Sequence, residues 1–283
     1  MNENNTAVKN GEGKQNGLSL KLIKYELKNM TSNIFVVIFG VIFPIFMAML
    51  FGFIIFDEIA AADAGYNAQR IYAMLFILFS GMIPLATMFI GHAENYALEL
   101  ESGVIQRMKL FGFSERTMLA AKLIANTVFL TGALIIYFAV LFIAFDMAAP
   151  TAAGIFTLII YLYAFAVVLM VLSHAIATLC GRFSLTFGIT MGMYFLFLVL
   201  GGMMGANPAQ FPAALRYLSM ALPMYYVTTY MIDLWTGEPF SFLGLSLSML
   251  GFAIASAGLL VFSVWFNKKG GRNNGDPKPV YYD

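Results

Sequence analysis

The side chains best suited to polar chemistry in this chain gather in one stretch, Glu99–Lys122. A central Arg or Lys costs about 2.5–3.5 kcal/mol in hydrocarbon, whereas a Leu returns only about 0.3–0.6 kcal/mol. Because long apolar runs flank the stretch on both sides, we expect a water-facing loop that contains one or two short helices. Its charged residues are Glu99, Glu101, Arg107, Lys109, Glu115, Arg116 and Lys122. Of these, Arg107 and Lys109 are expected to be exposed for an acidic partner.

Catalytic and cofactor chemistry have no matching motif. The sequence lacks a G-x-x-x-x-G-K-[ST] nucleotide loop, an H-E-x-x-H or G-x-S-x-G motif, and any cysteine cluster. For His92 beside Glu94, an ordinary polar helix end is favoured over a metal or catalytic pair. His174 lies inside an apolar run, where a neutral, hydrogen-bonded ring is favoured over a functional group. We therefore predict no catalytic, cofactor-binding or metal site on this chain.

The composition is that of an integral membrane protein. Of the 283 residues, 60% are hydrophobic and only 11% are charged, whereas soluble domains are about 25% charged. The single cysteine, Cys180, excludes an intramolecular disulfide framework. We expect an all-α polytopic fold with no separate soluble domain.

Six apolar segments, each long enough to cross a hydrocarbon core of roughly 30 Å, organise the chain. Pro44 and Pro84 lie inside two of them and are expected to kink them. The spans occupy 34–266, and the polar tails 1–17 and 267–283 are expected to be disordered. The predicted spans are Ile34–Phe56, Ile71–Ile90, Leu123–Phe145, Thr151–Leu179, Phe183–Met204 and Phe240–Phe266.

Residues 18–33, before the first span, are predicted to form an amphipathic helix. Lysines fall on one side, and such a basic helix typically lies in the headgroup plane; the alternative is a plain polar approach to the span. Thr31-Ser32-Asn33 offers side chains that can cap the next helix. The residues proposed for the interfacial role are Leu20, Ile23, Lys24, Leu27 and Lys28, with Met30 and Lys21 continuing the two faces.

Basic residues are distributed very unevenly between the two sides of a six-span topology. All of the 16 Lys and Arg residues except Arg70 and Arg216 fall on the side that holds both termini and the Glu99–Lys122 loop. Because short cytoplasmic segments carry the excess of Lys and Arg, we expect both termini to be cytoplasmic. The chain is then a multi-pass protein of the cell inner (plasma) membrane.

The segment 206–233 matches neither a loop nor a span. It is mostly apolar, but prolines break it into halves that are shorter than the roughly 17–25 residues of a crossing helix. We predict a re-entrant helical pair in the outer leaflet; the alternative is a helical hairpin resting on the outer surface. The residues that define this prediction are Pro208, Pro212, Pro223, Tyr225 and Tyr226, the two tyrosines being suited to the outer interface.

One local pattern goes further than topology. Glu99-Leu-Glu101-Ser-Gly103 is followed by Arg107, then by Ser114-Glu-Arg116, and then by Lys122. With the amphipathic helix, the six spans and the proline-broken segment, this pattern resembles the membrane permease subunit of an ATP-binding-cassette (ABC) exporter of the type-2 permease superfamily. The resemblance covers about Leu18 to Phe266. It implies a coupling helix that docks on an ATPase, with coupling residues Glu99, Glu101, Gly103, Arg107, Lys109, Arg116 and Lys122.

The resemblance also implies partners. These are two copies of a separate ABC ATPase that holds ATP and Mg, and a second permease subunit, identical or homologous; membrane lipid is expected as well, and nucleic acid is not. The chain departs from the family at Phe111-Gly112-Phe113, where a proline is usual in the turn. Because the spans carry almost no charge, we expect an apolar or amphiphilic cargo: a lipid-like molecule, a drug or a peptide. Rival interpretations are an ion-coupled secondary transporter and an intramembrane enzyme.

Overall fold

The computed structural model describes residues 18–61, 68–205 and 207–269, with the side chains of 55–61 left out. Every regular element in these ranges is a helix, so the predicted all-α fold is confirmed. Six helical segments in these ranges are long and apolar enough to cross a membrane. They are Ile34–Ile54, Ala68–Glu101, Glu115–Ala144, Ala152–Cys180, Phe183–Leu200 and Phe242–Lys269.

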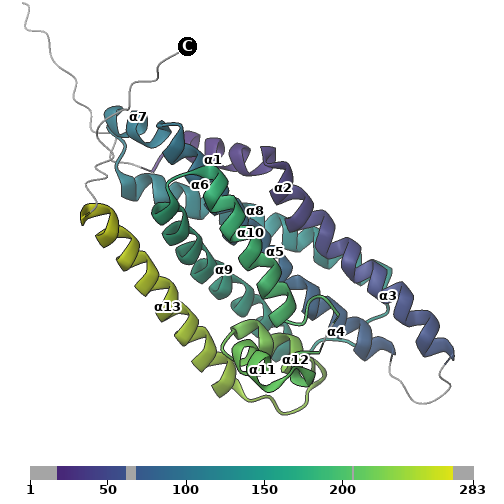
Figure 1. The fold of residues 1–283 in the computed structure, drawn as a ribbon. Coiled ribbons are helices and arrows are strands. Elements are labelled where there is room, and N and C mark those ends of the chain that lie inside the picture. Colours follow the sequence, from purple (N-terminus) through teal and green to yellow (C-terminus); the bar gives the residue numbers. More distant parts are fainter. Residues whose placement is uncertain (1–17, 62–67, 206, 270–283) are drawn as a thin grey trace, which may run out of the picture.

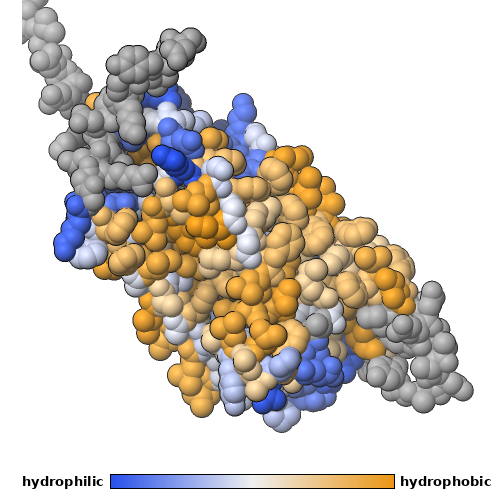
Figure 2. Space-filling model, viewed as in Figure 1, coloured by the Kyte–Doolittle hydropathy of each residue, from blue (hydrophilic) through white to orange (hydrophobic). Residues whose placement is uncertain are grey.

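The spans form an elongated bundle in which helices far apart in sequence lie side by side (Figure 1). An apolar band crosses the middle of the visible face, and hydrophilic residues gather near its two ends (Figure 2). One end carries the short helix α7 (Val104–Leu110), and we call it the α7 end; the opposite end carries α12 (Pro223–Thr236), and we call it the α12 end (Figure 1). The long helices are α8 (Glu115–Ala144), α9 (Ala152–Cys180), α10 (Phe183–Leu200) and α13 (Phe242–Lys269).

The second span forms the centre of the bundle. It runs from Ala68 to Glu101 and is almost wholly buried, unlike the other five candidate spans. The predicted boundaries, Ile71–Ile90, are therefore too short, because the helix continues past His92 as a buried and increasingly polar segment. Its elements are α4 (Ala68–Ser80), α5 (Met82–Pro84), the π-helix η2 (Leu85–Gly91) and α6 (His92–Glu101).

Both prolines expected to disturb spans lie beside π-helical turns. Pro84 immediately precedes η2, and Pro44 lies just after the π-helix η1 (Ile38–Ile42). Proline removes a backbone donor, and the wider π turn accommodates the interrupted hydrogen-bond ladder. The first span consists of α2 (Ile34–Val37), η1 and α3 (Phe43–Ala61). Asn33 caps it as predicted, since its side chain accepts hydrogen bonds from the amides of Phe35 and Val36.

The helix before the first span is α1 (Leu20–Ser32), and it packs along α8. Its described start and the end of α13 lie at the same end of the bundle (Figure 1). The predicted tails lie outside the described residues, except that α13 continues through Lys269.

The proline-broken segment folds as short helices at the α12 end. Pro208 and Pro223 each stand at the start of a helix, where their missing N–H groups are not needed. The helix that starts at Pro223, α12, packs against α4, α9 and α13. The elements are η3 (Pro208–Gln210), α11 (Ala213–Met220) and α12 (Pro223–Thr236). The dipping of this pair into a leaflet stays a prediction.

Candidate functional site

The predicted coupling segment is a short helix held between two glycine turns. The helix α7 (Val104–Leu110) starts after Gly103, whose φ is 70°, and ends before Gly112, whose φ is 87°. Both residues have left-handed backbones, which glycine adopts without steric cost. The Ser114 hydroxyl then accepts a hydrogen bond from the amide of Thr117 at 3.1 Å and caps α8. The chain therefore forms a helix–turn–helix–turn–helix unit at the α7 end.

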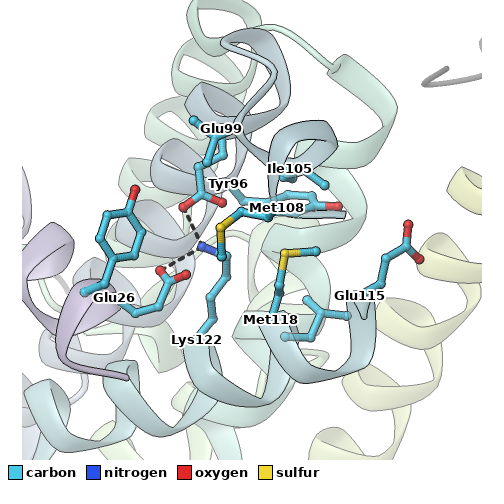
Figure 3. A pocket seen from close by; sticks show the side chains of 11 residues that line it. Glu26, Tyr96, Glu99, Ile105, Met108, Glu115, Met118 and Lys122 are labelled. Atoms are coloured by element: carbon cyan, nitrogen blue, oxygen red, sulfur yellow. Dashed lines mark hydrogen bonds and ion pairs between the residues drawn. The ribbon is translucent and has the colours of Figure 1, made fainter. Parts of the chain in front are cut away.

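Beneath α7 lies a buried ion triad, which we define as Glu26, Glu99 and Lys122 (Figure 3). Lys122 Nζ lies 2.8 Å from Glu26 Oε2 and 2.6 Å from Glu99 Oε1. The three side chains are 6–8% exposed. They come from α1, α6 and α8, so a single ammonium group joins α1 to the end of the second span and the start of the third.

The triad corrects two predictions. Glu99 and Lys122 do not face water, so they cannot contact a partner directly; they were expected in a loop because sequence alone did not show a buried counter-charge. That counter-charge is Glu26, which the sequence analysis missed. The buried face of α1 is Leu22, Glu26 and Met30. These three residues are spaced four apart, so the carboxylate of Glu26 lies between two apolar side chains on one face of the helix. That pattern is the sequence signal from which its burial could have been predicted.

The predicted apolar stripe of α1 has a different environment. Leu20 is 75% exposed, while Ile23 and Leu27 are only partly buried. Lys24 and Lys28 are exposed. Of the predicted stripe only Met30 is buried in the bundle, and the apolar atoms of Leu20, Ile23 and Leu27 are left wholly or partly available to an external apolar phase.

The helix α7 rests on the triad through apolar side chains. Ile105 is buried, and with Met108 it lines a cavity of about 30 Å³ between α7 and the triad (Figure 3). Tyr25 lines the same cavity, and burial, followed by the charges of Glu99 and Glu26, raises the pKa of its phenol. The contact between α7 and the spans is thus a small apolar layer above a charged centre.

The outer side of α7 is basic and apolar together. Leu110 is 87% exposed and Phe111 is 77% exposed, and Arg107, Lys109 and Arg116 are also exposed. Lys109 forms an ion pair with Glu115. Two large apolar side chains at the tip of a charged segment form a surface suited to contact with another protein.

The other predicted coupling residues have structural partners. Glu101 Oε2 accepts a hydrogen bond from the amide of Phe183 at 2.6 Å, so it caps the start of α10. The guanidinium of Arg107 donates to the carbonyl of Ser102 at 3.3 Å across the Gly103 turn. These bonds fix α7 relative to α6 and α10.

The two histidines meet inside the bundle, which sequence separation concealed. His92 Nε2 lies 3.4 Å from His174 Nδ1, and His92 Nδ1 lies 3.4 Å from Asn126 Nδ2. The ring of Tyr96 lies against that of His174, with centroids 4.2 Å apart and the ring planes tilted by 35°. Glu94 points elsewhere and accepts a hydrogen bond from Asn33 at 2.9 Å. No group of three His, Cys, Asp or Glu side chains within the described ranges has the arrangement of a metal site.

A second charged cluster links α4 and α12 at the α12 end. Arg70 lies 2.7 Å from Asp233 and also pairs with Glu238. The hydrogen bond from Arg70 lowers the pKa of Glu238 below its ordinary value of 4.5. Trp235 Nε1 donates to the carbonyl of Ala148 at 2.8 Å, which ties the same helix to the loop before α9.

The residues of the predicted re-entrant segment differ in exposure. Pro208 and Pro223 are buried and Pro212 is exposed. Tyr225 is only 3% exposed, so the expectation of an interfacial ring at this position is wrong: packing of α12 against the bundle turns it inward. Tyr226 is partly buried with its ring against Gly244.

One comparison with known proteins bears on this arrangement. The family model described as "ABC-2 type transporter" matches residues 19–234, which include the triad, α7 and most of α12. No curated protein sequence matches the chain significantly.

Proposed function

The chain belongs to the ABC-2 type transporter family and is the transmembrane subunit of an ABC transporter, and on that premise we propose that α7 couples it to a separate ATPase and that the complex exports its cargo. The observation that carries this proposal is the exposed pair Leu110 and Phe111 at the tip of α7. Full burial of such a side chain contributes roughly 1.5–3 kcal/mol. The flanking Arg107, Lys109 and Arg116 suit an acidic surface around an apolar pocket.

The anchoring of α7 supports a mechanical role. The Gly103 turn joins it to α6, Ile105 and Met108 pack it on the triad, and the Gly112 turn leads into α8. A displacement of α7 therefore acts on the second and third spans together. Through Lys122 and Glu26 it also acts on α1, whose exposed apolar stripe we propose lies in the membrane interface.

ATP and Mg belong to the partner in this proposal. The chain carries no phosphate-binding loop of its own. We propose two ATPase copies and a second permease subunit, identical or homologous, around one transport path, with both termini of this chain in the cytoplasm.

The proposed cargo is apolar or amphiphilic, entering from the bilayer. The span interiors are lined largely by Phe, Met, Leu and Ile, as in the central second span. Such surfaces gain roughly 25 cal/mol per Å² of apolar area removed from water, and they do not compensate the desolvation of a bare ion. A role in drug or antimicrobial resistance would follow from such a cargo.

One observation favours the rival, an ion-coupled secondary transporter. The second span extends further than predicted, and it brings His92, Glu94 and Glu99 into a candidate span, with Glu94 Oε1 lacking a hydrogen-bond partner. Intramembrane ionisable groups often serve ion pathways. Loss of transport on adding an uncoupler, with ATP held constant, would select this rival; ATP-dependent transport that ignores the uncoupler would exclude it.

The proposal is tested by purifying the tagged chain from its native membranes and measuring vanadate-sensitive ATP hydrolysis. The wild-type preparation is expected to hydrolyse ATP. Leu110→Asp and Phe111→Asp should lose this activity at equal chain yield, because each places a carboxylate in the proposed contact. Leu218→Asp is the matched control, since Leu218 is exposed on α11, which lies at the α12 end (Figure 1). The proposal would be overturned if the wild-type preparation had no ATPase activity, or if both tip variants kept the wild-type activity.

A further inference from the structure

A pocket lies between α6, α8, α9 and α13, and it shares Leu119 with the cavity beneath α7. It has a volume of about 250 Å³, and its walls include Leu123, Met170 and Leu260, with His92 and His174 as its polar members. This volume is slightly below the 300–1,000 Å³ of pockets that enclose a whole small ligand. It therefore suits one part of a molecule whose remainder stays in the bilayer.

A chain of hydrogen bonds from Asn126 through His92 to His174 determines which polar atom the pocket presents to a ligand. An amide nitrogen only donates, so Asn126 Nδ2 donates to His92 Nδ1. The proton of a neutral His92 ring then lies on Nε2, which donates to His174 Nδ1. The proton of His174 is thereby placed on Nε2, because a neutral imidazole carries one N–H.

His174 Nε2 has no hydrogen-bond partner in the part of the chain that the structure describes. The tilted ring of Tyr96 lies against the ring of His174. An unpaired N–H in apolar surroundings is unfavourable, so an occupant that brings an acceptor oxygen is favoured over a pure hydrocarbon. The occupant must therefore combine an apolar body with an acceptor.

A cation lies on the same side of α8, near the start of that helix. Arg116 is exposed and stands three and four residues before Leu119 and Ala120, which line the pocket. This spacing places it one helical turn, about 5.4 Å, nearer the start of α8. A phospholipid carries its phosphate only a few atoms from its ester carbonyls, and Arg116 places a cation one helical turn beyond the pocket-lining residues of α8.

We propose that this pocket binds an ester-linked phospholipid of the adjacent leaflet, with an ester carbonyl accepting from His174 Nε2, the acyl chain along α8 and α9, and the phosphate near Arg116. The site shares Arg116 with the surface proposed to contact the ATPase, whereas His174 and the apolar walls of the pocket do not belong to that surface.

The test uses the full chain in liposomes of ether-linked phosphatidylcholine. Two photoreactive phosphatidylcholines with the same diazirine, one ester-linked and one ether-linked, are compared by mass spectrometry of the labelled peptides. The ester probe should label the pocket segments of α8, α9 and α13 about 2- to 10-fold more, the range of one neutral hydrogen bond. Replacing the bulk lipid by its ester-linked counterpart should reduce labelling by competition.

Matched variants separate the donor from the pocket. His174→Gln keeps an acceptor and a donor and should retain the ester preference, whereas His174→Leu should bring the ratio of the two probes to about one. Val171→Phe fills the pocket while both histidines are kept, and it should lower labelling by both probes. Val128→Phe, at an exposed position of α8 outside the pocket, should change neither.

Three results would overturn the proposal. Equal labelling by the two probes in the wild-type chain would remove the role of the donor. Labelled peptides from elsewhere on the chain would remove the pocket as the site. Labelling that is unaffected by ester-linked bulk lipid would remove the bilayer as the source of the occupant.

Discussion

At the scale of single residues, Lys122 is the side chain that joins three helices. Its ammonium group holds two carboxylates from two other helices in a region that is 6–8% exposed. Buried pairs gain little over apolar packing, but breaking one leaves an uncompensated charge. The triad therefore specifies how α1, α6 and α8 meet more than it adds stability.

Lys122→Met is expected to destabilise the fold by about 3–5 kcal/mol, because Glu26 and Glu99 lose their shared cation. The measurement is the thermal unfolding midpoint of the purified chain in one detergent. The triple variant Glu26→Gln, Glu99→Gln and Lys122→Met removes all three charges and should recover most of the loss.

Lys109→Met provides the control for that experiment. Lys109 pairs with Glu115, and these side chains are 38% and 67% exposed. An exposed pair is worth about 0–1 kcal/mol, so this variant should have little effect. A Lys122→Met variant no less stable than Lys109→Met would show that the triad is not a structural centre.

At the α12 end, the pairing of Glu238 with Arg70 is expected to make the stability of the fold depend on pH. Arg70 lowers the folded-state pKa of Glu238 below the ordinary 4.5, so its ionised form is favoured by folding. The contribution to stability is present above about pH 4.5 and is lost as the pH falls through the lowered pKa. Unfolding midpoints measured between pH 7 and pH 3 should fall more steeply for the wild type than for Glu238→Gln. Parallel curves would contradict the assignment.

At the scale of elements, the sequence located the six spans and most of their ends, but it missed the end of the second span and the start of the third. Apolar length identifies a span, but the second span continues to Glu101 because its polar residues find partners on other helices. The same limit explains α1, whose helical period was recognised while its buried face was not. Glu26 is a polar residue at a buried position, and hydrophobic periodicity assigns such a residue to the outside.

The close approach of α9 to α12 gives a prediction at this scale. A Cβ added at Gly154 would lie 2.8 Å from the backbone Cα of Trp235. Gly154→Ala should therefore separate the two helices and destabilise the fold by about 1–3 kcal/mol. Gly132→Ala, in α8 with nothing within 4 Å of the added Cβ, should be neutral or stabilising by up to about 1 kcal/mol. Equal unfolding midpoints for both variants would refute the close contact.

At the scale of the whole molecule, patterns local in sequence were sufficient for the fold class and for α7. The glycines at 103 and 112 and the capping Ser114 form the turns that their residue types favour. The two clusters at the α7 end were not predictable in the same way. Glu26 and Lys122 are 96 residues apart, and His92 and His174 are 82 residues apart. Contacts over such separations depend on how the spans pack, which a single sequence does not encode locally.

The central claim is that the tip of α7 contacts an ATPase, and a photo-cross-linking amino acid at Phe111 tests it most directly. Native membranes carrying this variant are irradiated, and the cross-linked products are identified by mass spectrometry. The same amino acid at Leu218, exposed on α11 at the α12 end, is the control. We predict an adduct with an ABC ATPase at Phe111 and none at Leu218. An ATPase adduct at Leu218, or the absence of an ATPase adduct at Phe111, would contradict the account.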